Sequence, residues 1–446
     1  MSVTPSTFHV RTFGCQMNKH DSERVSGLLQ SHGMMPTDDL SSADVVVFMT
    51  CCVRENADDR LLGQVSSLKA VKSVRPDTMI AVGGCIGQRD GLRLLRVLPH
   101  VDVVFGTHNI SRLPELLTRA LTQNAPVVEV LDSSAKFTSD LPSRREHSWH
   151  AWVPITVGCD NHCTYCIVPY VRGPERSRPI DDVVRECETL VAGGVLEITL
   201  LGQNVNSYGR DLYGEPRFSE ILRQVAQTGP ARVRFATSHP KDLSQDTIAV
   251  MASMTEVCKA LHLPVQAGSN RILEAMNRRY TQAEYLALVS RLYEAIPGLA
   301  LSTDIIVGFP GETEADFQET LRVIREARYD QAFTFIYSPR KGTPAARMDG
   351  RVPREVVQER FDRLVSEVQA QAIAKNEALI GTVQTVLVEG PSKRDAAVIA
   401  GRTDGNKVIH APTEGDRDAR DLAGEFVDVE VLEAHTWFLA GRIVDR

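Results

Sequence analysis

Two patterns of apolar and polar positions alternate along the first ~120 residues. Short continuous apolar runs such as Val45–Met49 predict strands buried on both faces, and longer periodic segments such as Glu55–Val71 predict helices. The other predicted strands of this region are His9–Phe13, Met79–Val82 and Val101–Phe105, and the other predicted helices are Asp21–Ser31, a segment after Gln88, and Arg112–Leu121. Strands that alternate with helices predict a doubly wound α/β domain with a parallel sheet.

The alternation resumes at Trp152 and continues to about residue 340. The predicted strands are Val153–Val157, Leu196–Leu201, Arg232–Ala236, Ala260–Leu263, Ala300–Val307 and Ala332–Tyr337. The predicted helices include Asp181–Ala192, Phe218–Gln227, Tyr285–Ala295 and Ala315–Ala327, and a long helix contains Val357 to Val368. Six such units predict a partial (β/α)6 barrel.

Beyond Gly381 the pattern changes to short β-type runs separated by turn residues, which predicts a small β-barrel. The stretch from Leu131 to His150 contains several serines and few periodic apolar positions, as linkers do. We therefore expect an N-terminal domain over 7–122, a linker over 123–144, a core domain over 145–376 and a C-terminal domain over 377–446.

The composition indicates the cellular compartment of the chain and the role of its cysteines. No apolar run approaches the roughly 18 residues of a membrane span, and Met1–Phe13 does not resemble a secretory signal, so we expect a cytoplasmic chain without a membrane partner. Nine cysteines in a reducing compartment indicate metal binding or catalysis more than disulfides. The net charge of −7 argues weakly against nucleic acid, because local basic patches matter more than the sum.

Three cysteines form a Cys-x3-Cys-x2-Cys motif directly after the strand Val153–Val157, namely Cys159, Cys163 and Cys166. Thiolates are the preferred ligands of iron–sulfur clusters. Three thiolates hold three irons of a four-iron cluster, and the fourth iron stays open for the amino and carboxylate groups of a methionine-derived cofactor. The alternative is a set of buried or zinc-binding cysteines, with His162 as the fourth zinc ligand.

A second set, Cys15, Cys51 and Cys85, follows the first three predicted strands of the N-terminal sheet. The carboxyl ends of parallel strands gather at one edge, so these thiols could converge on a second cluster. The alternative is three buried core cysteines. Cys52 adjoins Cys51, but adjacent side chains point in different directions, so both are not expected to bind one iron. We interpret the two remaining cysteines, Cys187 and Cys258, as packing residues.

The segment GCDNHCTYCIVPYVRGPERSR, over 158–178, resembles the radical S-adenosylmethionine (SAM) methylthiotransferases. The segments TFGCQMN, TCCVREN and VGGCIGQ are similar to the three N-terminal cysteine segments of that family, with Cys51 rather than Cys52 as the ligand. Met49 replaces the usual asparagine and Ala267 the usual serine. The resemblance implies two 4Fe–4S clusters, SAM as cofactor, and a C-terminal TRAM domain.

In such a barrel the cofactor lies at the carboxyl ends of the strands. Tyr165, just before the last cysteine, fits an aromatic residue beside the adenine of the cofactor. Polar and glycine residues flank the other strands in the segments LLGQNVNSYG, HLPVQAGSN and STDIIVGFPGET. The candidate cofactor-binding residues are Tyr165, Gly194, Glu197, Gln203, Asn204, Thr237, His262, Gln266, Ser269 and Asp304.

The resemblance further implies that the auxiliary cluster donates a sulfur that one SAM molecule methylates, while a second SAM yields the radical. One family branch modifies isopentenylated adenosine beside the tRNA anticodon, a second modifies threonylcarbamoyl adenosine, and a third modifies a ribosomal-protein aspartate. The segments SPRKGTPAARM and GRTDGNKVIHAP resemble the first branch. We therefore expect the anticodon stem-loop of tRNA and an electron donor such as flavodoxin or ferredoxin as partners of a monomer. A non-catalytic iron–sulfur RNA-binding protein is the alternative from another class.

The basic residues that would contact RNA are less clear from the sequence. Residues 377–446 contain eight Lys and Arg against 13 Asp and Glu, a net charge of −5, so RNA contact there needs a local patch. That patch would be Lys393, Arg394, Arg402 and Lys407. Better candidates near the cofactor face are Arg172, Arg176, Arg178, Arg278, Arg279, Arg340, Lys341 and Arg347, with Tyr170 or Phe309 as a stacking platform for a base. The alternative for each group is a solvated surface.

Overall fold

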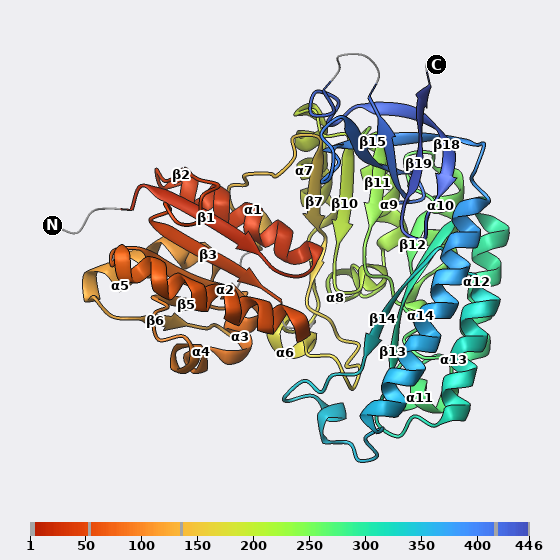
Figure 1. The fold of residues 1–446 in the computed structure, drawn as a ribbon, viewed down its shortest axis with the longest axis horizontal. Coiled ribbons are helices and arrows are strands. Elements are labelled where there is room, and N and C mark those ends of the chain that lie inside the picture. The colour runs from red at the N-terminus through yellow and green to blue at the C-terminus, as the bar shows by residue number, and fades with distance from the viewer. Residues whose placement is uncertain (1–4, 52–54, 134–136, 414–417, 445–446) are drawn as a thin grey trace.

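The computed structural model describes residues 5–51, 55–133, 137–413 and 418–444. Its chain forms an N-terminal α/β unit, a central partial barrel and a small C-terminal β-barrel, in that order (Figure 1). This architecture confirms the predicted fold class. Among the described residues, no helix combines the length and apolar character that crossing a bilayer requires.

The N-terminal unit is a six-stranded parallel sheet in the order β2-β1-β3-β4-β5-β6. Its strands are β1 (Thr7–Thr12), β2 (Met35–Pro36), β3 (Val45–Thr50), β4 (Met79–Gly84), β5 (Val103–Phe105) and β6 (Val127–Glu129). Its helices are α1 (Gln16–Ser31), α2 (Glu55–Val74), α3 (Cys85–Asp90), α4 (Leu92–Val97), η1 (Ile110–Arg112) and α5 (Leu113–Gln123). β6 lies inside the predicted linker, so the sheet extends further along the chain than its apolar pattern indicates.

Helices cover both faces of this sheet. Side chains of α1 and α5 pack on one face, around Val47 and Phe105. Side chains of α2, α3 and α4 pack on the other face, around Phe48 and Val82. Every residue of β3 and β4 is buried, as the continuous apolar runs predict for a central parallel strand. The doubly wound arrangement places the carboxyl ends of β1, β3 and β4 at one edge.

The central unit has two three-stranded parallel sheets, β7-β10-β11 and β12-β13-β14, and an isolated bridge between Val233 and Val257 links β11 to the segment before β12. The strands are β7 (His150–Pro154), β10 (Glu197–Leu201), β11 (Arg232–Phe235), β12 (Ala260–His262), β13 (Ala300–Val307) and β14 (Gln331–Ile336), with the short pair β8 (Thr156–Val157) and β9 (Arg176–Ser177). The helices are α6 (Val168–Arg172), α7 (Ile180–Ala192), α8 (Arg210–Tyr213), α9 (Phe218–Gln227), α10 (Gln245–Ser253), α11 (Asn270–Ala275), α12 (Gln282–Ala295), α13 (Glu314–Ala327) and α14 (Arg354–Glu377). Single 3-10 turns are η2 (Thr138–Asp140), η3 (Val205–Ser207), η4 (Pro240–Asp242) and η5 (Pro344–Arg347).

The six strands leave one side of the barrel open, and their inner face carries polar groups. Along β13 buried residues alternate with half-buried ones, so Ser302, Asp304 and Ile306 face the interior while their neighbours pack against helices. The C-terminal unit is a closed barrel in the order β15-β16-β17-β19-β18. Its strands are β15 (Val383–Pro391), β16 (Val398–Thr403), β17 (Val408–Pro412), β18 (Phe426–Ala434) and β19 (Leu439–Val444).

Candidate active site

The first cysteine trio lies in the loop between β8 and α6. Gly158, just before Cys159, has φ +87°, and a Cβ there would lie 1.9 Å from the carbonyl oxygen of Pro174. Only glycine fits that approach. The Gly158 N–H donates to Oε1 of Gln203 at the end of β10. The strand-end segment therefore fixes the start of the cysteine loop.

Burial controls the charge of these thiols. It raises the pKa of Cys159 to about 11 and the pKa of Cys166 to about 12, and the neighbouring Cys163 thiol adds to both shifts. The thiols are therefore close enough for their charges to interact. Cys163 also accepts a hydrogen bond from Arg278 Nη1 at 3.4 Å, so a buried cation faces the trio.

The second trio gathers at the edge of the N-terminal sheet. Cys15 is the N-cap residue of α1, Cys51 follows β3, and Cys85 begins α3 directly after β4. A hydrogen bond with the Cys51 thiol lowers the pKa of Cys15 to about 6 against the opposing effect of burial, and the charge of Arg172 lowers it further. The fourth cysteine of this region, Cys52, lies outside the described residues.

A single metal ion and a four-iron cluster require different arrangements of three cysteine ligands. Within the described part of the chain, no three His, Cys, Asp or Glu side chains are arranged to hold one metal ion, as a zinc site would require. In a four-iron cube each thiolate binds its own iron, so the thiolates surround the cluster rather than converge on one atom. The donor set of each trio, three thiolates beside a buried arginine, fits an anionic cluster.

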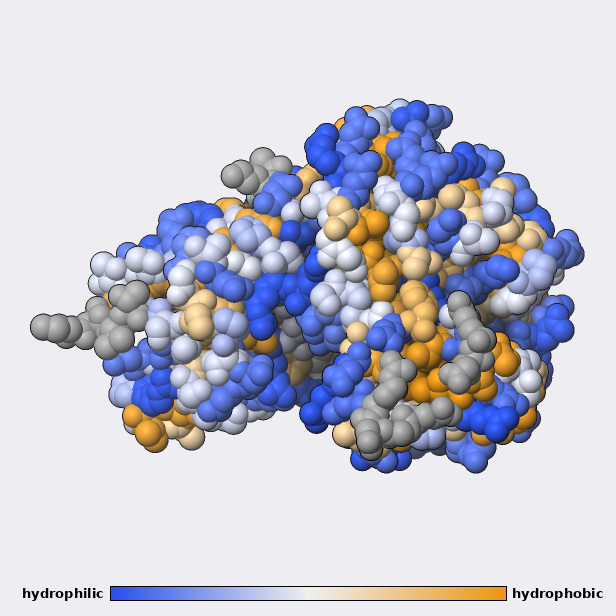
Figure 2. All heavy atoms as spheres, turned by 90° about the horizontal axis from the view of Figure 1, so that it is seen from above, coloured by the Kyte–Doolittle hydropathy of each residue, from blue (hydrophilic) through white to orange (hydrophobic). Residues whose placement is uncertain are grey.

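One cleft of about 1780 Å³ joins both trios to the interior of the partial barrel. Five of the six cysteines line it, and Cys85, which is 5% exposed, lies just outside its lining. Figure 2 shows the hollow between the N-terminal unit and the rest of the molecule, bordered by hydrophilic side chains. The two trios thus face the same space from opposite sides of the domain boundary.

Most of the predicted cofactor residues also reach this cleft. Those that line it are Tyr165, Glu197, Gln203, Thr237, His262, Gln266 and Asp304. His262 Nδ1 lies 3.0 Å from Ser302 Oγ, and its Nε2 lies 3.4 Å from Asp304 Oδ2, which ties β12 to β13 inside the barrel. Glu197 stands at the amino end of β10 and accepts from Arg234 Nε at 2.8 Å, away from the cysteines.

The other three predicted residues lie outside the lining. Gly194 forms the turn before β10 with φ +86°. Asn204 Nδ2 donates to Asp242 at 2.8 Å, and Ser269 Oγ donates to Asp316 at 2.5 Å. These two hydrogen bonds hold the loops that carry the strand ends.

Unsatisfied and strained groups follow the carboxyl ends of four strands, β10, β11, β12 and β14. Asn204 Oδ1, Ser238 Oγ and Tyr337 Oη are buried without a hydrogen-bond partner among the described residues. Thr237 and Gln266 both have φ +72°, which a β-branched threonine rarely adopts. Unpaired buried polar atoms and strained backbone concentrate at binding sites, so this edge fits a polar cofactor such as SAM.

Several residues expected to face RNA are instead buried. Arg172, Arg178 and Arg278 are 4–6% exposed. Arg178 pairs with Glu186, and the other two contact the cysteine trios, so none can reach a phosphate. Phe309 is fully buried and cannot stack on a base, whereas Tyr170 is exposed. The sequence shows basic residues after each motif, but contains no signal for their burial across a domain boundary.

Comparisons with known proteins agree with this architecture. Residues 153–324 match the Radical SAM superfamily, residues 7–106 match the uncharacterized protein family UPF0004, and residues 377–444 match the TRAM domain. The fold is similar to that of the radical SAM methyltransferase TsrM from Kitasatospora setae, with a TM-score of 0.55 and 14% identity over 77% of this chain and 74% of that one. Fold and motif together define a radical SAM enzyme, a class that implies a 4Fe–4S cluster and SAM.

Two curated relatives cover nearly the whole chain. The tRNA-2-methylthio-N(6)-dimethylallyladenosine synthase of Carboxydothermus hydrogenoformans is 47% identical over 99% of this chain and 100% of its own length. The protein of the same name from Acidothermus cellulolyticus is 52% identical over 96% of this chain and 86% of its own length. The chain belongs to the family of tRNA-2-methylthio-N(6)-dimethylallyladenosine synthases.

Proposed function

We propose that this enzyme adds a methylthio group to C2 of N6-isopentenyladenosine at position 37 of tRNA. The relatives that share its full length carry the name of that reaction. The cleft that both cysteine trios face is the single observation that carries the proposal, because sulfur donor and radical source must act on the same bound base.

The six cysteines would hold two 4Fe–4S clusters, Cys159, Cys163 and Cys166 the one that binds SAM, and Cys15, Cys51 and Cys85 the auxiliary one. When bound, these groups supply a radical that abstracts hydrogen from an unactivated C–H bond, and a sulfur atom that one SAM methylates. The strand-end residues of the chain would position the cofactor in the cleft.

The charge of the cleft supports an RNA substrate. Among the described residues, seven lysines and arginines besides the buried Arg278 line it against four acidic side chains, although the whole chain carries −7. Arg340, Arg402 and Lys407 belong to this lining, so basic groups come from the partial barrel and from the TRAM barrel. A concave surface with local positive charge attracts phosphates regardless of net charge. We propose that the anticodon stem-loop binds here, that flavodoxin or ferredoxin supplies electrons, and that the enzyme acts as a monomer.

Deletion of the gene followed by nucleoside analysis of bulk tRNA tests the substrate. We expect 2-methylthio-N6-isopentenyladenosine to disappear and N6-isopentenyladenosine to accumulate. The wild-type gene should restore the product, and a Cys163→Ala gene should not. An unchanged level of the methylthio nucleoside would refute the proposal. Loss of methylthiolation on a ribosomal aspartate or on threonylcarbamoyl adenosine would favour the other branches.

Iron and sulfide analysis after anaerobic reconstitution tests the two clusters. We expect about eight irons per chain, since two cubes hold four each. Replacing either trio with alanine should remove half of them. The matched control is Cys187→Ala with Cys258→Ala, two cysteines buried away from the trios, which should keep the full count. Four irons in the intact protein would leave the auxiliary site without a cluster.

A further inference from the structure

A five-residue helix connects the two cysteine trios directly. α6 begins two residues after Cys166, yet its side chains belong to the N-terminal unit. Ile167 and Val171 pack into the same hydrophobic cluster as α2, α3 and α4, and the Val171 carbonyl accepts from Thr107 Oγ1 at 2.7 Å. Figure 1 shows α6 lying beside α3, below the sheet edge where the second trio gathers. The end of the radical-SAM motif is therefore built into the auxiliary domain.

Arg172, the last residue of α6, reaches the second trio from this position. Its Nη2 donates to Asp21 at 2.8 Å and to Asn18 Oδ1 at 2.9 Å, both in the first turns of α1 behind Cys15. The charges of Cys85 and Cys15 both act on the guanidinium, so it lies near both thiols. Arg172 is 6% exposed, and Asp21 and Asn18 are fully buried. One guanidinium thus joins the Cys15 segment to the radical-SAM loop, and it also lies near Cys85.

An arginine beside the auxiliary cysteines can donate hydrogen bonds to the sulfurs of a cluster. Hydrogen bonds to the sulfurs of an iron–sulfur cluster stabilise its more negative, reduced state and so raise its reduction potential. Arginine can donate to a carboxylate and a thiolate at once, because its planar fork carries five N–H groups, whereas lysine acts as a point charge. Arg278 stands in a similar relation to Cys163 of the other trio.

We propose that Arg172 is a positioning residue for the auxiliary cluster: it holds the Cys15 segment in place, stabilises the reduced cluster, and fixes that cluster relative to the radical-SAM loop. The inference rests on the second cluster of the proposed function.

Arg24 provides a matched control. It lies on α1, its Nη2 pairs with Glu186 across the same domain boundary at 2.7 Å, and it also contacts His20 and Leu141. Among the described residues it contacts no cysteine. Arg24→Met leaves Glu186 paired with Arg178, so it removes an interdomain arginine without an unpaired charge.

The experiment uses the full chain with Cys159, Cys163 and Cys166 replaced by alanine, so that iron binds only the auxiliary trio. Iron content and the midpoint potential from an EPR-monitored redox titration are compared in three variants. Arg172→Met combined with Asp21→Asn removes the donor without leaving a buried carboxylate unpaired. Arg172→Lys keeps the charge but not the fork, and Arg24→Met is the control.

We expect Arg172→Met with Asp21→Asn to disfavour the reduced cluster about tenfold, which is about 59 mV for one electron. Arg172→Lys should recover part of this shift, and Arg24→Met should stay within twofold of the parent. Loss of iron in the double variant alone also supports the proposal. A full iron content with an unchanged potential would overturn the role of Arg172 and leave the cluster intact. A parent protein without iron would instead refute the second cluster, and Arg172's role with it.

Discussion

At the residue scale, Gly14 shows how a missing side chain brings two cysteines together. It precedes Cys15, has φ +121°, and a Cβ there would lie 2.1 Å from Cβ of Cys51. Replacement by alanine must therefore move Cys15 and Cys51 apart, in addition to straining the backbone. Gly33, which follows α1, lacks such a close contact. Its φ is +86°, but an added Cβ would meet no described atom within 4 Å.

We therefore expect Gly14→Ala to lose about half of the reconstituted iron and to keep the iron of the radical-SAM trio. Gly33→Ala meets only the left-handed backbone penalty of about 1–2 kcal/mol, and should lower stability while keeping all of the iron. Iron analysis and thermal unfolding of both variants measure the two effects. Equal iron contents would show that the Gly14 contact does not set the cysteine spacing.

Glu23 makes the folding stability of the protein depend on pH. Burial raises the pKa of this carboxyl on α1 from 4.5 to about 7, and the N–H of Glu146 opposes the shift. Between pH 4.5 and 7 the folded chain holds a proton that the unfolded chain has released, so stability falls as pH rises and stays low above 7. A shift of about 2.5 units corresponds to about 3 kcal/mol.

Glu23→Gln should remove this dependence, because the amide keeps an oxygen for the Glu146 N–H. We expect the variant to exceed the wild type by up to about 3 kcal/mol at about pH 8 and by less than about 1 kcal/mol at about pH 5. Urea unfolding at the two pH values measures the difference. A difference that does not change with pH would mean that Glu23 is ionised in the fold.

Single residues also show what the sequence can and cannot predict. Each of the six cysteines follows a strand, so topology alone gathers them at sheet edges, as the structure shows for both trios. The sequence places Arg172 and Arg278 among the RNA contacts, because a basic residue after a motif is usually exposed. Their burial depends on contacts with segments over 100 residues away, such as Asp21 and Cys163, and no local pattern encodes those contacts.

At the scale of elements, the segment after β12 is tied to the start of α13. Ser269 Oγ donates to Asp316 Oδ1, and Asp316 Oδ2 accepts from the N–H and hydroxyl of Thr313 in a capping box. Arg271 pairs with the same carboxylate. The N-terminal cap of a barrel helix therefore holds the loop that carries Gln266 into the cleft.

Ser269→Ala should loosen that loop and weaken SAM binding about fivefold, equivalent to about 1 kcal/mol. Thr281→Ala removes a comparable capping box from α12. It should cost about 1 kcal/mol of stability and leave SAM affinity within twofold. Calorimetric titration of both reconstituted variants with SAM distinguishes them. Equal affinities would show that the link to α13 does not order the cofactor loop.

Element boundaries are predictable where one periodicity dominates. The predicted helix Phe218–Gln227 coincides with α9, because its apolar positions recur at helical spacing and pack as Ile221, Leu222 and Val225 in the barrel core. β6 is absent from the prediction because three residues, Val127–Glu129, are too short for an alternating pattern to show. β6 forms because it pairs with β5, and the local sequence of the segment does not show that pairing.

At the scale of the whole molecule, two arginines dock the TRAM barrel on the partial barrel. Arg232 of β11 donates to the carbonyls of Arg402 at 2.7 Å and Thr385 at 2.8 Å, and its guanidinium lies 4.9 Å from the ring centroid of Phe426. Arg234 donates to the carbonyls of Thr403 and Asp404. These contacts set where Arg402 and Lys407 enter the lining of the cleft.

Arg232→Ala removes two charge-assisted, part-buried hydrogen bonds to backbone carbonyls, and such bonds are worth about 1.5–3 kcal/mol each. We expect hydrogen exchange in β16 to accelerate at least tenfold, because the docked barrel separates more often from β11. Affinity for the anticodon stem-loop should fall as well, since the cleft then loses the fixed position of its TRAM residues.

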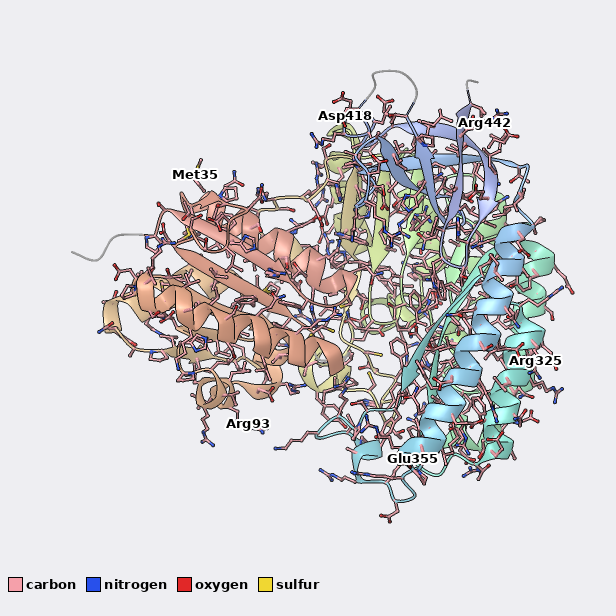
Figure 3. All side chains as sticks on the ribbon, viewed as in Figure 1. Met35, Arg93, Arg325, Glu355, Asp418 and Arg442 are labelled. Atoms are coloured by element: carbon pink, nitrogen blue, oxygen red, sulfur yellow. The ribbon has the colours of Figure 1, made fainter. Side chains whose placement is uncertain are left out.

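Arg442→Ala is the control. Arg442 points outward from the TRAM barrel (Figure 3), where it pairs with Glu430 and its side chain is 64% exposed. This substitution should change neither the exchange rate nor the affinity by more than twofold, since an exposed ion pair contributes little. If Arg232→Ala behaved like this control, the TRAM barrel would be held by its other contacts, and its basic residues would reach RNA without help from β11.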